Sequence, residues 1–324
     1  MTRPVDDRVV LTGHGTVRAE TADGDGTWFD AAQYLGPRGW RYLTPATRYV
    51  LAAAGLAMAD ARFDPTGMSD DEVGVAIGTN FAAAPVVQRF DDVVAAETAA
   101  GISPAEAPAF SVNIPASQIS MRHGLRAFNL SLTNPMVAGL EAVLTLRSAV
   151  LRGRARAGIA GATEERPGAA AARVVGAPFA GEGACCVLLE RAADARERSA
   201  PAGPEVVGGF SVFVGHAADN PEAFADAVGR QLAALLDGVT GPLPYAPPAG
   251  SFPLRDQVDE AFRRWAAQAG VELASVDLPG ATGQDFTVSP VLQLAGLAAE
   301  HGHGLVLAAG PHGHLAGVRL RAAA

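Results

Sequence analysis

The segment from Phe128 to Leu140 has the pattern of a site for nucleophilic catalysis, with Met136 where the nucleophile would stand. It predicts a short apolar strand over residues 128–133, a tight turn, and a helix that begins at Ala138. A side chain in such a turn lies at a helix N-terminus, where free N–H groups and the helix dipole stabilise an anionic nucleophile or an oxyanion. The Met136 thioether has no proton to lose and is a poor nucleophile beside a thiolate. We therefore expect a covalent-catalysis site that lacks its nucleophile.

Other side chains that could do chemistry are few. The chain contains no lysine, which excludes Schiff-base chemistry and lysine-assisted decarboxylation. Its two cysteines, Cys185 and Cys186, are neighbours in an apolar run, so they predict core residues on opposite faces of a strand. The histidines of residues 301–303 and 312–314 have no Cys or carboxylate at ligand spacing. We expect neither a metal nor a cofactor.

Composition places the chain among soluble globular proteins. It has 324 residues, of which 49% are hydrophobic, enough for one large core or two fused halves. No run of 18 apolar residues suggests a membrane span, and the first seven residues do not resemble a signal peptide. A formal net charge of −9 argues against nucleic acid or anionic lipid as the main partner. We therefore expect a cytoplasmic protein without a nucleic-acid or membrane partner.

Apolar strands alternate with helical patterns along the whole chain, which favours an α/β protein with a parallel or mixed sheet covered on both faces. The strands are expected at residues 9–15 (ending in a Gly turn), 73–79, 128–133, 155–161, 183–190, 205–213, 243–248, 305–309 and 317–321. The helices are expected at residues 45–61, 83–99, 116–123, 138–152, 221–236, 253–270 and 288–300. Residues 192–204 predict a mid-chain connection. This alternation of strands and helices predicts one compact unit with two halves, residues 1–191 and 205–324.

In their order and spacing, several segments resemble the β-ketoacyl synthase branch of the thiolase-like superfamily. They are Val9–Gly15, Tyr34–Trp40, Thr44–Arg48, Asn113–Leu125, Pro178–Glu190 and Gly310–His314. The resemblance implies a thiolase-like fold, with two pseudo-symmetric halves and mixed sheets layered between helices in the order αβαβα.

The resemblance also assigns the family's catalytic positions, and every one of them is altered here. The nucleophilic Cys falls on Met136, the first catalytic His on Gly280 and the second on Gln284. The chain is shortened within residues 277–290, where the family's lysine would stand. The family's Gly-rich gating loop falls on Gly310, Pro311, His312 and Gly313, with Pro311 in place of a Phe. No intrinsic condensing activity is expected, because neither a nucleophile nor a general acid–base is supplied.

An inactive ketosynthase paralogue of this kind resembles the chain length factor of bacterial type II polyketide synthases, which serve polyketide and antibiotic biosynthesis. The resemblance implies a heterodimer with an active ketosynthase and an acyl carrier protein that delivers the chain. It departs from the common chain length factor pattern, which has Gln at the nucleophile position. Tunnel or interface positions would be Ala116, Gln118, Ile119, Met121 and Met136, unless these side chains simply pack in the core.

Two other readings of the chain stay open. A repurposed ketosynthase-like enzyme, such as a cyclase, dehydratase or acyl transferase, would need a new polar constellation from Thr133, Asp285, His312 and His314. A stand-alone module that binds acyl carrier protein would lack a large apolar dimer face. A basic cluster near a helix end could dock an acidic carrier protein or be solvated there: Arg147, Arg152, Arg154 and Arg156.

Overall fold

The computed structural model describes residues 7–19, 28–167, 181–215, 221–249 and 253–323. The strands are β1 (Val9–Arg18), β2 (Val73–Gly78), β3 (Asn129–Leu132), β4 (Ala157–Glu164), β5 (Gly183–Arg191), β6 (Glu205–Phe213), β7 (Leu243–Ala246), β8 (Leu273–Ser275), β9 (Gly304–Ala309) and β10 (His314–Arg321). The helices are α1 (Ala31–Leu35), α2 (Pro45–Asp60), α3 (Ala84–Glu97), α4 (Ile114–His123), α5 (Ala138–Leu151), α7 (Ala192–Glu197), α8 (Pro221–Leu235), α9 (Pro253–Ala269) and α10 (Ser289–Glu300).

The strand order repeats in mirror image about the middle of the sheet. It runs β3-β2-β4-β5-β1-β6-β10-β9-β7-β8. In the first half β2 is parallel to β3 and β4, and β5 is antiparallel to β4 and β1. In the second half β7 is parallel to β8 and β9, and β10 is antiparallel to β9 and β6. The pairing of Val10 in β1 with Glu205 in β6 joins the two halves of the sheet. The division of the chain into halves 1–191 and 205–324 stays a prediction. The strand order is compatible with it.

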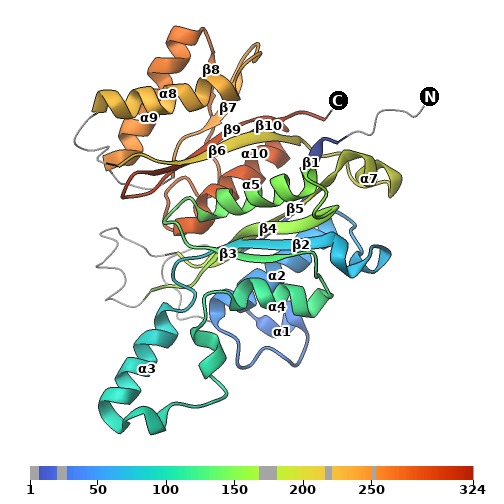
Figure 1. Ribbon diagram of the computed structural model, residues 1–324, viewed down its shortest axis with the longest axis vertical. Helices are drawn as coiled ribbons and strands as arrows, with labels where there is room; N and C mark the ends of the chain where they lie inside the picture. Colours follow the sequence, from blue (N-terminus) through green and yellow to red (C-terminus); the bar gives the residue numbers. More distant parts are fainter. Residues whose placement is uncertain (1–6, 20–27, 168–180, 216–220, 250–252, 324) are drawn as a thin grey trace.

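The helices form three layers around the two parts of the sheet (Figure 1). Helices α5 and α10 lie between them: α5 contacts both β2 and β4 on one side and β6 and β10 on the other. Helices α1, α2 and α4 cover the outer face of the first part, and α8 and α9 cover the second. The expected αβαβα layering of a thiolase-like fold is confirmed. Helix α3 projects away from these layers at the lower left of Figure 1.

Close packing of small residues sets the distance between β1 and α2. A Cβ atom built at Gly15 would lie 2.2 Å from the carbonyl oxygen of Ala53, so only glycine fits there. The expected Gly turn after residue 15 is therefore wrong: the glycines serve close contact with α2, and β1 continues to Arg18. Helix α2 begins as expected, with the Thr44 hydroxyl accepting a hydrogen bond from the backbone N–H of Thr47.

Short elements were the ones that the sequence pattern did not reveal. Residues 192–204 are not a plain connection, because α7 occupies Ala192–Glu197. Helix α1 and strand β8 are five and three residues long, too short for a periodic signal. Strand β10 begins at His314 rather than at Gly317, since its first residues pair with the end of β6.

Candidate functional site

Met136 lies in the sharp turn between β3 and α5, two residues before the helix begins. Its φ angle is +66°, in the left-handed region that residues other than glycine rarely adopt. Its side chain is fully buried. A left-handed backbone at such a residue costs roughly 1–2 kcal/mol and persists only where the surrounding structure holds it. The turn thus retains a strained backbone around a side chain that cannot act as a nucleophile.

Apolar side chains from three separate loops enclose Met136. It forms a buried cluster with Ala249 and Phe286, and Phe81 packs against this cluster. The rings of Phe81 and Phe286 lie 5.2 Å apart between centroids and are tilted by 53°. A flexible thioether fills the irregular space between aromatic rings well. The position expected to hold a nucleophile is therefore occupied by ordinary core packing.

A buried carboxyl group fixes the loop that carries Phe81. The Glu164 carboxylate accepts hydrogen bonds of 2.8 Å from the backbone N–H groups of Asn80 and Phe81, and one of 3.2 Å from the Thr79 hydroxyl. The Asn80 amide in turn donates to the Thr287 hydroxyl at 2.7 Å. Burial raises the pKa of Glu164 to about 7, although these donors oppose the rise. Glu164 therefore positions the wall of the Met136 cluster, and both of its carboxylate oxygens accept hydrogen bonds from that loop.

The loop from Gly310 to Gly313, expected to gate the site, lies directly against the Met136 turn. A Cβ atom at Gly310 would come within 2.5 Å of the Pro135 carbonyl oxygen, so the loop approaches the turn closely. The Gly310 N–H donates to the His314 carbonyl at 2.7 Å, which closes the loop between β9 and β10. Pro311 is half-buried and His312 is exposed. The structure thus brings this predicted loop to Met136; its gating role stays a prediction.

The segment that carries Gly280 and Gln284 also reaches the cluster. Gly280 has a φ angle of +90° and packs against the start of α10, where a Cβ atom would lie 2.5 Å from the Ser289 carbonyl oxygen. Gln284 is half-buried, and its carbonyl accepts a hydrogen bond from the Gly181 N–H at 2.9 Å. Two residues later Phe286 enters the Met136 cluster. The assignment of Gly280 and Gln284 to the two His positions stays a prediction.

The two thiols lie elsewhere and are chemically quiet. Cys185 and Cys186 are fully buried in β5 and belong to different core clusters, on opposite faces of the strand. Their expected role as core residues is confirmed. Burial raises the pKa of Cys185 to about 12 and holds that of Cys186 well above its ordinary value. Neither thiol can replace the nucleophile missing at Met136.

Helix α4 divides the predicted tunnel residues into two groups. Ala116 and Ile119 are fully buried in the core cluster that includes α2. Gln118 is half-buried, and Met121 is 65% exposed. Packing in the core, the alternative left open for these positions, describes Ala116 and Ile119. A tunnel or interface role stays a prediction for Gln118 and Met121.

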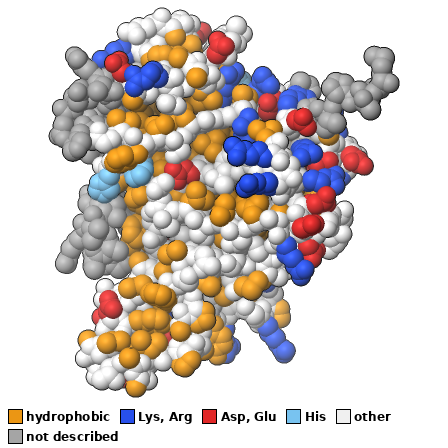
Figure 2. Space-filling model, viewed as in Figure 1, with side chains coloured by type: hydrophobic (Ala, Val, Ile, Leu, Met, Phe, Trp, Pro, Cys, Tyr) orange, Lys and Arg blue, Asp and Glu red, His pale blue; other side chains and the backbone are white. Residues whose placement is uncertain are grey.

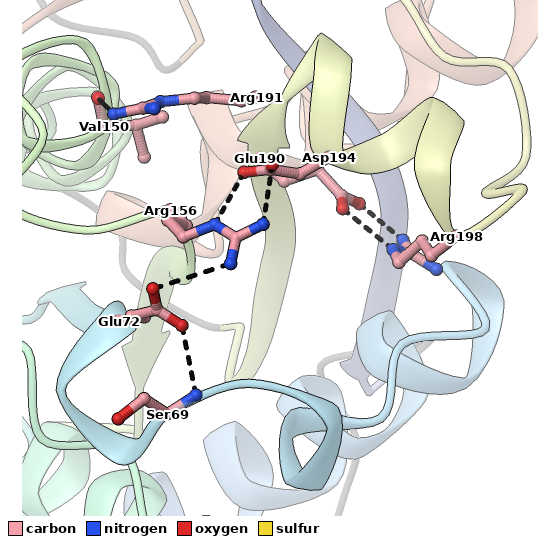
Figure 3. A network of polar contacts seen from close by, with 8 residues as sticks. All are labelled: Ser69, Glu72, Val150, Arg156, Glu190, Arg191, Asp194 and Arg198. Atoms are coloured by element: carbon pink, nitrogen blue, oxygen red, sulfur yellow. Dashed lines mark hydrogen bonds and ion pairs between the residues drawn. The ribbon is translucent and has the colours of Figure 1, made fainter.

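The predicted basic cluster at the end of α5 does not act as one group. Arg156 is bound in a network with Asp194, at 2.8 Å from Nη2 to Oδ1, and with Glu72, at 3.5 Å (Figure 3). In the same network the Arg198 Nη2 donates to the fully buried Glu190 carboxylate at 2.5 Å. Arg156 is therefore a structural residue that joins β4, α7 and the segment before β2.

The four residues of the alternative enzyme reading are not assembled into a site. Asp285 is buried, lies 3.9 Å from an Arg18 nitrogen, and has a pKa raised by burial. The His314 ring packs on Phe213 at 4.8 Å, while His312 is exposed. No hydrogen bond or ion pair joins any two of these groups, or joins them to Thr133, within the described ranges.

The described residues offer neither a metal-binding cluster nor a membrane-spanning helix. They contain no group of three or more His, Cys, Asp or Glu side chains placed to hold a metal ion. They also contain no helix both long and apolar enough to cross a membrane.

Sequence reasoning missed the residues that surround Met136. Phe81 and Ala249 follow the ends of β2 and β7, and Phe286 precedes α10. Strands β2 and β7 each pair in parallel with a neighbour, β4 and β9, so residues just after their carboxyl ends were a usable signal. Glu164 had a similar signal, since it is an acidic residue at the end of a buried strand.

The layered fold, the duplicated strand order and the turn before α5 define a thiolase-like protein. The chain belongs to the β-ketoacyl synthase family: the family model "Beta-ketoacyl synthase, N-terminal domain" matches residues 6–177, more than half of the chain. The resemblance noted in the sequence is thereby confirmed at the level of the family.

Individual relatives are distant in sequence. The 3-oxoacyl-[acyl-carrier-protein] synthase 2 of Rhizobium meliloti is 29% identical over 217 residues, which cover 59% of this chain and 52% of the relative. The actinorhodin polyketide putative β-ketoacyl synthase 2 of Streptomyces coelicolor is 29% identical over 125 residues, 39% of this chain and 31% of the relative. The chain thus spans about half or less of the length of these curated relatives.

Two solved structures match nearly the whole chain. One is a type II polyketide synthase acyl carrier protein in complex with its ketosynthase bound to the hexaketide; its TM-score is 0.81 at 18% identity, covering 97% of this chain and 99% of that chain. The other is the ishigamide ketosynthase/chain length factor, with a TM-score of 0.75 at 22% identity, covering 98% and 100%. At these identities the likeness shows the fold alone.

Proposed function

We propose that this chain is a non-catalytic, ketosynthase-like chain length factor of a type II polyketide synthase. It pairs in the cytoplasm with an active ketosynthase, helps to wall the tunnel for the growing chain, and meets the acyl carrier protein that delivers it. One observation carries the proposal: a family scaffold holds Met136, fully buried among apolar side chains, at the turn where a nucleophile is needed.

The edge of the sheet supports pairing with another chain. Among the described strands, β3 is bonded only to β2, which leaves its other side without a neighbour. Leu130 on β3 is 45% exposed, and Met121 on α4 and Leu151 at the end of α5 are 65% and 42% exposed. An unpaired strand edge with exposed apolar side chains favours contact with another chain.

The comparisons support the same partners. A solved structure with the same fold is a ketosynthase/chain length factor, and another is a ketosynthase bound to a type II acyl carrier protein. Several curated relatives are named as synthases, so the inactivity of this chain rests on its own residues.

The main alternative, a repurposed enzyme on carrier-bound chains, has less support. It needs convergent polar groups beside a cavity, whereas Met136 is enclosed by Phe81, Phe286 and Ala249. The third reading, a stand-alone binding module, is disfavoured by the exposed apolar edge at β3.

Co-purification tests the proposal. The chain is co-expressed with the ketosynthase encoded beside its gene, with an affinity tag on one subunit only, and the mass of the purified species is measured by light scattering. We expect a complex with one copy of each chain. A matched tagged ketosynthase from fatty-acid synthesis serves as the control partner and should not be retained. A chain that purifies as a stable monomer or homodimer and never binds the neighbouring ketosynthase contradicts the proposal.

A further inference from the structure

A groove of about 920 Å³ runs beside the unpaired edge of β3, and its charged side chains are mostly cationic. Its walls come from β3, α5 and β6, the elements that lie at the centre of Figure 1. Three guanidinium groups line it, against one carboxyl group: Arg147, Arg152 and Arg154, and Glu141. We call it the arginine groove. Its positive charge stands out because the whole chain has a net charge of −9.

The charges of the groove are not balanced from within. The Glu141 carboxylate accepts hydrogen bonds from the Asn134 amide at 2.9 and 2.8 Å and from the Ser211 hydroxyl at 2.5 Å, so its oxygens already have donors. Arg147 donates to the backbone carbonyls of β6 at Val206, at 2.7 Å, and Val207. These bonds satisfy the donors of Arg147, and the carboxylate that favours its charge, Glu205, lies outside the groove lining.

Arg152 and Arg154 are exposed at the mouth of the groove. Within the described part of the chain, neither guanidinium group has a hydrogen-bond or ion-pair partner, unlike that of Arg156, which is bound by Asp194 and Glu72. Figure 2 shows Arg side chains over the position of α5, with hydrophobic side chains around them. Two unpaired cations beside an apolar strand edge form a surface that is complementary to carboxylates.

We propose that the arginine groove receives a carboxylate-bearing segment beside the exposed strand edge of the active ketosynthase, and that this charge selects the partner. The inference rests on the proposed function and adds the chemistry of partner choice. In a symmetric pair of identical chains at this edge, both sides of the interface would present the same surface, so two copies of Arg152 and Arg154 would lie in it with no added acidic groups. Like charges facing each other across an interface disfavour that pair, whereas Asp or Glu side chains favour a different chain.

Charge reversal at the groove tests this inference. The variant Arg152→Glu/Arg154→Glu and the neutral variant Arg152→Gln/Arg154→Gln are compared with the control Arg230→Glu/Arg264→Glu. Its arginines lie in the cleft between α8 and α9, where Arg264 is paired with Glu260. Binding of each to the purified partner ketosynthase is measured by interferometry at about 50 mM and about 500 mM NaCl.

We expect the groove reversal to weaken binding at least about tenfold at low salt, the neutral variant to lie between it and wild type, and the control to stay within about twofold. High salt should narrow these differences, because it screens exposed charges. Circular dichroism confirms folding, and the neutral variant remains informative if the reversal fails to fold. If both groove variants bind the ketosynthase as well as wild type does, this inference is overturned and the proposed function is not. Wild type that does not bind at either salt overturns the proposed function.

Discussion

Replacement of Met136 by Ala and by Gly separates two effects at the turn: loss of packing and relief of backbone strain. Deleting a fully buried Met side chain beyond Cβ is expected to destabilise the chain by about 2–5 kcal/mol. Ala keeps the strain of a φ angle of +66°, whereas Gly adopts that angle freely and recovers roughly 1–2 kcal/mol. Gly also loses one more buried carbon, about 0.8 kcal/mol, and gains unfolded-state freedom of about 0.4–1 kcal/mol. These terms nearly cancel, so the Ala and Gly variants should be about equally stable.

The matched control is Leu140, which is also fully buried but lies in regular α5 helix. There no left-handed strain is present, and Gly should be less stable than Ala by roughly 1–2 kcal/mol, from its lower helix propensity and the lost buried carbon. Urea unfolding of the purified chain, followed by far-ultraviolet circular dichroism, measures all four variants at equal slope. The test compares the stability difference between the Ala and Gly variants at the two positions. An equal difference at Met136 and at Leu140 would refute the strained turn.

Three further changes have defined outcomes. Burial raises the pKa of Glu165 to about 8, above its unfolded value of 4.5, so its contribution to stability is complete below pH 4.5 and declines up to pH 8. In Glu165→Gln the amide oxygen can still accept a hydrogen bond from the Ala46 N–H, and the fall of the urea midpoint with rising pH should become flatter. An unchanged pH dependence of the midpoint would count against the pKa shift. Arg198→Met leaves the buried Glu190 carboxylate with only the Thr12 hydroxyl as a donor and should lower the free energy of unfolding by about 3–5 kcal/mol. The double variant with Glu190→Gln should lose less stability, and an equal loss in the single and double variants would disprove the pairing. Met136→Cys should not elongate carrier-bound malonyl units without a partner, because the chain has no lysine and no assembled base; measurable elongation would reverse that conclusion.

Periodic elements were predictable, since their signal is repeated over many residues. Helix α2, from its Thr44 cap onward, and the buried strand β5 match the expected ranges closely because apolar spacing and capping are local properties. Short elements such as β8 carry too few residues for a period. The pair of glycines in β1 was misread as a turn because their reason, the approach of α2, depends on a residue far away in the sequence.

The site was predictable in position but not in composition. Met136 was identified from a local pattern and the Gly310–Gly313 loop from the family resemblance, and the structure brings them together. The sequence did not reveal the left-handed backbone of Met136 or its enclosure by three side chains: Phe81, Ala249 and Phe286. These side chains come from three loops that only the sheet order brings to one place. Likewise, the structure distinguishes Arg156, which is bound in a network, from Arg152 and Arg154, whereas their spacing alone made them one cluster.

Product formation by the reconstituted pair tests most directly whether this chain is a non-catalytic partner. The complex with the neighbouring ketosynthase, acyl carrier protein and malonyl donor is assayed for polyketide by mass spectrometry, alongside one complex with Met136→Ala and one in which the partner's nucleophilic cysteine is replaced by Ala. We predict that elongation requires both chains, survives Met136→Ala, and is lost when the partner's cysteine is replaced. Elongation by this chain alone, or by the complex without the partner's cysteine, would contradict a non-catalytic role.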